Sequence, residues 1–140
     1  MPKVIEIDHI YIATSDLRRS EAFYDRVFVD VLGFRQNGFT LGSDPHIQYF
    51  NRHFGYALRP ARASPAHDSY APGLHHFCLR GDSVSEVVEI AEPLHGLGIA
   101  ASEAALHSEY APDYWTTFFM DPDGIRLEVT NYRRDRHDNR

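Results

Sequence analysis

The sequence contains two copies of one pattern. Residues 4–34, VIEIDHIYIATSDLRRSEAFYDRVFVDVLGF, and residues 74–99, LHHFCLRGDSVSEVVEIAEPLHGLGI, each begin with a short apolar run that carries a histidine. Each then passes through a Ser/Asp-rich helix start and a helix to Leu-Gly and a large apolar residue. Internal self-similarity indicates a repeated structural unit. Strand-like runs follow each helix, so each half is predicted to be β-α-β-β-β.

The second helix has well-defined start and stop signals. Ser83 and Glu86 form the S-x-x-E pattern of a capping box at its start. Pro93 is expected to end or kink the helix, because its ring clashes with the preceding turn. Gly33 and Gly98 stand where the C-terminus of each helix needs a left-handed residue.

The predicted strands set the module boundaries. The runs after the first helix are GFRQNGFT, HIQYFNR and FGYALRP, and those after the second are GIAAS, WTTFFMD and IRLEVTNY. The predicted fold class is α+β, with two tandem βαβββ modules forming cupped mixed sheets. We expect a single domain over 1–140, with module one at 4–60, a Pro/Ala/Ser linker at 61–73, module two at 74–132 and a flexible tail at 133–140.

Composition excludes several classes of function. The net charge is -6 and no dense Lys/Arg stripe occurs, so no nucleic-acid partner is expected. No apolar run approaches the ~18 residues of a membrane span, and no basic-apolar leader precedes the first strand, which predicts a cytoplasmic protein with no membrane partner. Cys78 is the one cysteine, so an internal disulfide is impossible and a reducing compartment is favoured.

Two histidines and one carboxylate form the candidate metal site. His9 and His76 occupy equivalent positions in the repeat, and Glu128 lies in the last strand of the second half, on the polar face of DPDGIRLEVT. Two imidazoles and a carboxylate with open positions suit Fe(II), Mn(II), Zn(II) or Ni(II). The alternative is that the histidines are hydrogen-bonded core or rim residues and that Glu128 faces water.

The elements DHIYIATSDLRRSEAFY, GLHHFCLR and FFMDPDGIRLEV resemble the vicinal oxygen chelate superfamily, which includes glyoxalase I, extradiol dioxygenases, fosfomycin resistance enzymes and bleomycin-binding proteins. The resemblance implies paired modules around a divalent metal held by His9, His76 (not His75) and Glu128. Fe(II) or Mn(II) is favoured, and Zn(II) or Ni(II) is the alternative. It also implies a small-molecule substrate and a homodimer whose sites draw on both subunits.

The sequence departs from two members of that superfamily. Glyoxalase I has a fourth ligand, a Glu on the last strand of module one, and the matching position here is Leu58 or Arg59. Extradiol enzymes have a tyrosine about ten residues before the carboxylate ligand, where this chain has Phe118. Tyr114 is nearby, out of register by an even number of residues, so it can share the same face.

Four residues are candidate substrate contacts. Arg126 shares the face of Glu128 and can hold an anionic group, Tyr114 and Trp115 can stack on a planar ligand, and Arg59 can bind an anion in place of the missing Glu. The alternatives are rim packing for the aromatic pair and solvent-exposed strand positions for the arginines.

The expected function is that of a divalent-metal-dependent enzyme that chelates vicinal oxygens of a small substrate. Extradiol dioxygenase-like chemistry is the first hypothesis. A glyoxalase-like lyase, isomerase or thiol transferase is the second, and a metal-free drug-binding resistance protein is the rival from another class. The sequence identifies neither the substrate nor a catalytic acid or base.

Overall fold

The computed structural model describes residues 1–63 and 65–134. Most of the predicted flexible tail, residues 135–140, lies outside the described residues. The chain divides into two compact units, Met1–Ala66 and His67–Arg140. This division falls within the predicted linker. Among the described residues, no helix has the length and apolar character needed to span a membrane.

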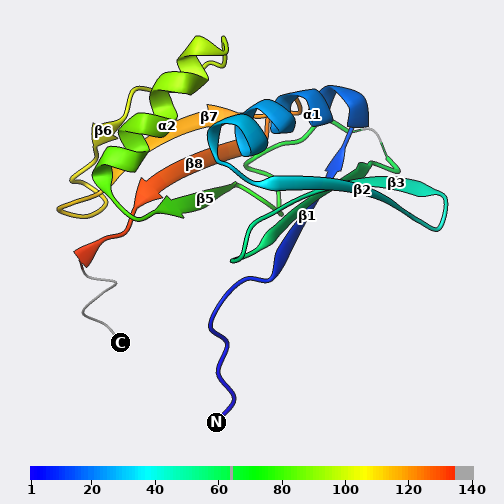
Figure 1. The fold of residues 1–140 in the computed structure, drawn as a ribbon, viewed down its shortest axis with the longest axis horizontal. Coiled ribbons are helices and arrows are strands. Elements are labelled where there is room, and N and C mark those ends of the chain that lie inside the picture. Colours follow the sequence, from blue (N-terminus) through cyan, green and yellow to red (C-terminus); the bar gives the residue numbers. More distant parts are fainter. Residues whose placement is uncertain (64, 135–140) are drawn as a thin grey trace. The chain divides into compact units, whose positions relative to one another are not determined.

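The first unit is a βαβββ module. Its elements are β1 (His9–Thr14), α1 (Leu17–Tyr24) with the π-helix η1 (Asp25–Val31), β2 (Arg35–Leu41), β3 (Asp44–Phe50) and β4 (Gly55–Pro60). The sheet order is β1-β4-β3-β2, with β1 parallel to β4 and the other pairs antiparallel. The helical segment lies along one face of this sheet (Figure 1).

Aromatic side chains fill the space between that helix and its sheet. Tyr24, Phe28, Tyr49 and Tyr56 are fully buried. The hydroxyl oxygens of Tyr24 and Tyr56 lie 2.9 Å apart, so each buried phenol has a polar partner. The opposite face of the sheet carries His9, whose side chain is more than half exposed.

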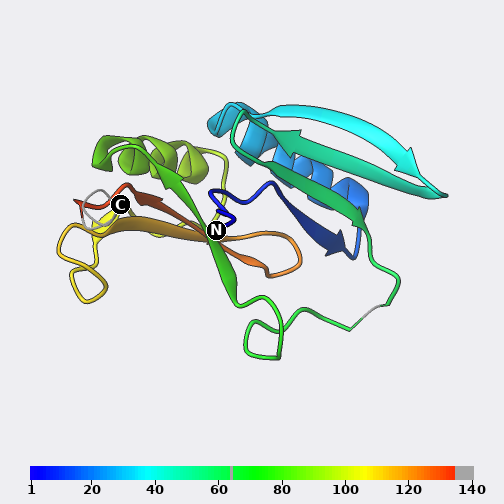
Figure 2. The same ribbon diagram turned by 90° about the horizontal axis from the view of Figure 1, so that it is seen from below.

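The second unit repeats the first. Its elements are β5 (His76–Gly81), α2 (Val84–Gly96), β6 (Ala105–Leu106), β7 (Trp115–Met120) and β8 (Arg126–Asn131), in the sheet order β5-β8-β7-β6. Helix α2 lies along one face of this sheet (Figure 2). The prediction of an α+β fold built from two βαβββ modules is confirmed. So is the prediction that the Glu128 strand lies beside the first strand of its module.

Helix α2 begins at the predicted capping box and ends just before the predicted left-handed glycine, Gly98. Both hydrogen bonds of the capping box are present between Ser83 and Glu86. Pro93 does not end the helix, which continues to Gly96. Since Pro93 lies near the C-terminus, little helix remains to be distorted, and the full burial of Leu94 holds the last turn against the sheet. Gly98 then adopts the predicted left-handed conformation, with φ 75°.

The predicted strand GIAAS at 98–102 is wrong. The strand that pairs with β7 is the short β6, in which Ala105 pairs with Thr116. Ser102 still contacts β7, since its backbone N–H donates to the carbonyl of Phe118 at 2.9 Å. Three hydrogen bonds between Ser102 and β7 take the place of the strand ladder, and period-2 patterning in five residues cannot distinguish the two arrangements.

The DPDG turn fixes the register of β8. The Asp121 carboxylate accepts hydrogen bonds from the backbone N–H groups of Asp123 and Ile125, both at 2.9 Å. Gly124 follows the turn with φ 82°, a left-handed conformation that suits glycine. Ile125, Leu127 and Val129 are then buried on the helix side, so Arg126, Glu128 and Thr130 lie on the opposite face, as predicted.

Candidate metal and substrate site

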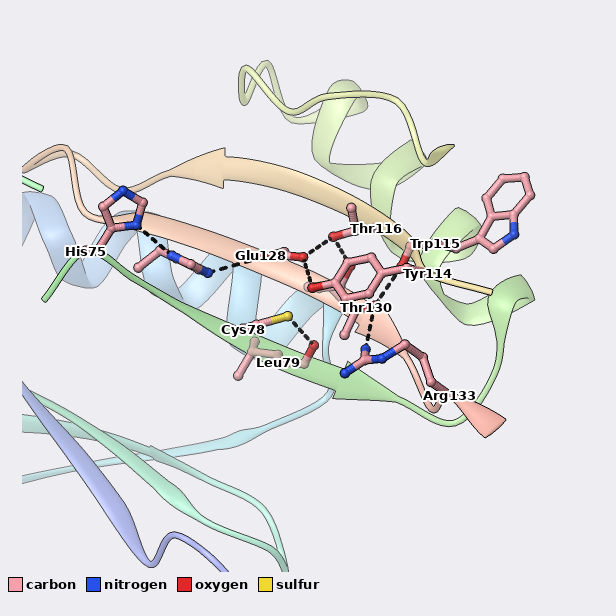
Figure 3. Close-up of polar contacts among 11 residues, drawn as sticks. His75, Cys78, Leu79, Tyr114, Trp115, Thr116, Glu128, Thr130 and Arg133 are labelled. Atoms are coloured by element: carbon pink, nitrogen blue, oxygen red, sulfur yellow. Dashed lines mark hydrogen bonds and ion pairs between the residues drawn. The ribbon is translucent and has the colours of Figure 1, made fainter. Parts of the chain in front are cut away.

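Glu128 is a buried carboxylate with two hydroxyl donors. Its exposed fraction is 3%. The Tyr114 hydroxyl donates to Glu128 Oε2 at 2.5 Å, and the Thr116 hydroxyl reaches the same oxygen at 2.8 Å (Figure 3). Burying a carboxylate costs free energy unless hydrogen bonds compensate for lost water, and these two bonds do so at one oxygen only. Glu128 is therefore not the water-facing carboxylate of the alternative interpretation.

The second oxygen of Glu128 faces a histidine. His76 Nε2 lies 3.5 Å from Glu128 Oε1, and His76 Nδ1 lies 2.8 Å from His75 Nδ1. One of these two Nδ1 atoms must carry the shared proton. When His76 Nδ1 donates to His75, the lone pair of His76 Nε2 is directed towards Glu128. That tautomer of His76 is the one suited to a metal.

Cys78 lies on the same face of the sheet as His76 and Glu128. It is the cross-strand partner of Glu128 in the β5–β8 pair. The residue as a whole is exposed to solvent. Desolvation of its sulfur and the negative charge of Glu128 raise the pKa of the Cys78 thiol to about 12. Desolvation, followed by the hydrogen bond to Glu128, also raises the pKa of Tyr114 above its usual value. Both groups are therefore neutral at physiological pH.

The pair formed by His76 and Glu128 fits two ligands of one divalent ion. Two ligand atoms each ~2.1 Å from a metal, at angles of ~90–110°, lie roughly 3.0–3.4 Å apart. The separation of 3.5 Å between His76 Nε2 and Glu128 Oε1 is close to this value. Tyr114 and Thr116 bind the other carboxylate oxygen of Glu128, and His75 lies next to Nδ1 of His76. Outer-shell partners of metal ligands have the same role. Within residues 1–63 and 65–134, no group of three or more His, Cys, Asp or Glu side chains gathers as a metal site would need.

A pocket of about 970 Å³ opens beside this pair. Its volume is near the upper end of the ~300–1,000 Å³ typical of small-molecule sites. The residues that line it all belong to the second unit and are mostly aromatic or apolar: Tyr70, His75, His76, Ala100, Tyr110, Tyr114, Phe118, Phe119, Met120, Arg126, Leu127 and Glu128. The pocket thus combines the candidate ligands with apolar walls and one cation.

The predicted substrate contacts of this unit separate into two groups. Arg126 and Tyr114 line the pocket. Trp115 does not line it, and its indole points away from Glu128 (Figure 3). The reason is strand alternation, because Trp115 begins β7 and Thr116, the next residue, faces Glu128.

His9 lies on the sheet of the first unit. Its Nδ1 is 2.7 Å from the Asp8 carboxylate, and its side chain is 53% exposed. It lines a separate polar pocket of about 380 Å³ within that unit. A carboxylate at Nδ1 fixes the ring orientation and leaves Nε2 accessible, which is an arrangement found for metal-ligating histidines.

Arg59 is paired within the first unit. Its guanidinium contacts the Asp44 carboxylate, which Arg62 also reaches at 2.8 Å. The hydrogen bond from Arg62 and the charges of both arginines hold the pKa of Asp44 below its usual value, against a desolvation that raises it. The charge of Arg59 is thus already compensated by a neighbour.

The two sheets also define the position that matches Glu128 in the first unit. Glu128 pairs with Cys78, two residues after His76, and the equivalent partner of Tyr11 is Ala57. The predicted match to Leu58 or Arg59 is therefore shifted by one or two residues. Ala57 has no ligand atom, so the conclusion that this strand supplies no carboxylate is unchanged.

Sequence reasoning missed two residues of the site. Thr116 faces Glu128 because Phe118 pairs with Glu128 across the β7–β8 hairpin. The five-residue connection after Met120 gives this register, so the signal was available in the sequence. Tyr70 lies in the segment before β5, where its ring contacts the Arg126 guanidinium, and no sequence pattern indicates this contact.

Comparison with known proteins identifies the family of this fold. The family model described as Glyoxalase/Bleomycin resistance protein/Dioxygenase superfamily matches residues 6–129. A glyoxylase/bleomycin resistance protein/dioxygenase domain from Frankia sp. EAN1pec is similar in structure, with a TM-score of 0.76, 19% identity and coverage of 94% of this chain and 100% of that chain. No curated protein has a significant sequence match to this chain.

Two further solved structures show the same fold. A glyoxalase family protein from Enterococcus faecalis has a TM-score of 0.65 and 28% identity, covering 89% of this chain and 96% of that one. A genomically encoded fosfomycin resistance protein from Listeria monocytogenes has a TM-score of 0.65 and 14% identity, covering 100% and 99%. Members of this superfamily bind small molecules, commonly use divalent metals and often dimerise. The repeated βαβββ units and the match over residues 6–129 show that the chain belongs to the glyoxalase/bleomycin resistance protein/dioxygenase superfamily.

Proposed function

We propose that this chain is a divalent-metal-dependent enzyme that binds a small substrate through two adjacent oxygen atoms. The observation that carries the proposal is the position of Glu128. Its carboxylate is 3% exposed and receives hydroxyl hydrogen bonds at one oxygen, while the other oxygen faces His76 Nε2 at 3.5 Å. A purely structural carboxylate has no need of an imidazole at that distance and of a large pocket beside it.

The proposed metal ligands are His76, Glu128 and His9. His9 would come from a first unit, either of the same chain or of a second copy in a homodimer. The bound ion, Fe(II) or Mn(II) in first place and Zn(II) or Ni(II) otherwise, supplies a Lewis acid with open positions for substrate oxygens. With His75 accepting a hydrogen bond from Nδ1 of His76, Nε2 of His76 would be available to the ion, and Tyr114 and Thr116 would orient the carboxylate.

Metal analysis is the direct test. Protein expressed with added metal and purified without chelators should contain close to one equivalent of a divalent ion, and His9→Ala, His76→Ala and Glu128→Gln should each lose it. Less than about one tenth of an equivalent in the native protein would contradict the proposal. His53→Ala is a matched control, because His53 is also a partly exposed histidine of the first unit and has no proposed role.

Dioxygenase chemistry is the first activity to measure within this proposal. O₂ uptake should require Fe(II) and a catechol-type substrate and should disappear in Glu128→Gln. If no catechol in a broad panel supports O₂ uptake while metal is bound, the lyase, isomerase or thiol transferase branch replaces it.

A metal-free binding protein is the second candidate function, and the aromatic lining of the pocket favours it. Tyr70, Tyr110, Tyr114 and Phe118 supply rings that can hold a planar drug-like molecule. A native protein that contains no metal after metal-replete expression, yet binds aromatic compounds equally before and after Glu128→Gln, would support this function over the enzyme.

A further inference from the structure

Arg126 is a cation of the pocket without a carboxylate partner. It is partly buried at the start of β8, and in the described part of the chain no carboxylate lies within ion-pair distance of its guanidinium. Its guanidinium carbon lies 5.2 Å from the centre of the Tyr70 ring, and its Nη1 lies 3.4 Å from the Tyr70 hydroxyl. Arg59 differs, because Asp44 already compensates its charge.

A guanidinium without a carboxylate partner is suited to bind an anionic ligand. Arginine always carries its charge, and its planar fork matches a carboxylate in a bidentate manner. The ring and hydroxyl of Tyr70 hold the guanidinium in place, and the hydroxyl engages only one of its N–H donors, which leaves the others for an anion. The site therefore has one pre-oriented recognition element for a negatively charged group.

The walls of the pocket favour an aromatic ring beside that anion. Tyr110 and Tyr114 meet edge to face, with ring centres 5.3 Å apart, and Phe118 also lines the pocket. Offset and edge-to-face contacts with such rings stabilise an aromatic ligand beyond the burial of its apolar area. An aliphatic ligand would gain only the stabilisation from burying its apolar area.

The backbone spacing of Arg126 and Glu128 suits a ligand about one aromatic ring long. The two residues lie two positions apart on one strand face, which corresponds to ~6.6 Å along the strand. This is about the span of one benzene ring with a substituent at each end. An anionic group held by Arg126 would stay clear of the negative charge of Glu128, while the far end of the ring would reach His76 and Glu128.

We propose that the ligands of this pocket are aromatic carboxylates, with the carboxylate on Arg126 and the ring among Tyr110, Tyr114 and Phe118. The orientation of the ring's far end towards His76 and Glu128 rests on the proposed function. Recognition of the anion and of the ring does not, because neither Arg126 nor the aromatic walls depend on a metal.

Calorimetric titration of the full chain with benzoate, benzamide and cyclohexanecarboxylate tests the proposal. Benzoate should bind at least tenfold more tightly than benzamide, which has the same shape without charge, and more tightly than cyclohexanecarboxylate, which has the charge without the aromatic ring. Arg126→Gln should remove the preference for benzoate over benzamide and leave benzamide affinity unchanged. Equal affinities in the native protein, or a preference that survives Arg126→Gln, would overturn the proposal.

Two control variants separate this proposal from the metal proposal. Arg80→Gln should leave all three affinities unchanged, because Arg80 also lies over a tyrosine ring, at 4.0 Å from Tyr132, but does not line the pocket. Glu128→Gln should lose metal while keeping benzoate binding, since the anion contacts Arg126 and not Glu128. If benzoate binding disappears together with the metal, the anion is held by the ion and the Arg126 proposal is wrong.

Discussion

The Tyr114 hydroxyl donates a hydrogen bond of 2.5 Å to Oε2 of Glu128, across the strands of the β7–β8 hairpin. This contact makes Tyr114 a positioning residue for the carboxylate, which differs from the stacking role expected from the sequence. The Arg133 guanidinium lies 4.5 Å from the centre of the Tyr114 ring and restrains it further (Figure 3). The orientation of Glu128 therefore depends on side chains from outside β8.

Removing these hydroxyl groups should weaken metal binding without unfolding the protein. Tyr114→Phe is expected to lower divalent-metal affinity ~10–100-fold, the usual effect of losing an outer-shell partner. Thr116→Val should act in the same direction but less strongly, because the Thr116 hydroxyl is shared with the Val129 carbonyl at 3.0 Å. Competition titration with a metal-sensitive dye measures both affinities.

Tyr110→Phe is the matched control for that measurement. Tyr110 lines the same pocket, and its ring contacts Tyr114, but no hydrogen bond joins it to Glu128. Its metal affinity should equal that of the native protein. An equal loss in Tyr110→Phe and Tyr114→Phe would mean that pocket shape, and not the hydrogen bond, controls the metal.

Glu128→Gln should separate metal binding from stability. Glutamine has the same shape and still accepts the hydrogen bonds of Tyr114 and Thr116, so circular dichroism and the urea midpoint should change little. Metal affinity should fall by more than the ~10–100-fold typical of outer-shell changes, because a charged ligand is lost. Retention of native metal content would exclude Glu128 as a ligand.

Cys78 should be an exposed cysteine that reacts slowly. With a pKa of about 12, its thiolate fraction at pH 8 is ~10⁻⁴, and only the thiolate is alkylated. In chelator-treated protein, the rate of reaction with iodoacetamide should keep rising about tenfold per pH unit to pH 10, whereas an ordinary cysteine levels off near its pKa of ~8.5.

Glu128→Gln tests the cause of that slow reaction. The variant removes the carboxylate charge but not the desolvation, so Cys78 should react faster than in the native protein and still more slowly than free cysteine. An unchanged rate would show that the charge of Glu128 does not act on the thiol.

The Asp44 cluster should make stability depend on pH in the acid range. The pKa of Asp44 is lowered in the folded state from 3.8, so its stabilisation is present above that value and is lost as pH falls through the folded pKa. Asp44→Asn should lower the urea midpoint at pH 7, and this difference should shrink towards pH 2. Asp30→Asn, at an exposed carboxylate, should show neither effect; an equal pH dependence of both variants would rule out the ion pairs as its cause.

The repeat and the alternation of β8 were enough to predict much of this molecule. Two modules, the pairing of β5 with β8 and the opposite faces of Leu127 and Glu128 follow from period-2 patterning, because a slip of one residue would bury the charge under α2. The ligand identities of His9, His76 and Glu128 stay predictions.

The remaining features depend on contacts that leave no local pattern. Pro93 was expected to end or kink α2, and it does not end the helix, because the buried Leu94 holds the last turn against the sheet. Neither the π-helix η1 nor the contact between Tyr70 and Arg126 has a recognisable signal in the sequence. The role of Tyr114 was missed because a long side chain can reach a carboxylate from beyond its own strand.

The hydrogen bonds of Asp121 to the backbone of Asp123 and Ile125 have a consequence for how this protein can change. Side chains along β8 can be exchanged one at a time, so new ligands can be accommodated by substitution at Arg126 or its neighbours. The length of the turn cannot vary in the same way. One inserted or deleted residue would exchange the inner and outer faces of the whole strand, and mutation is therefore free to alter what the pocket binds only while the spacing of DPDG stays constant.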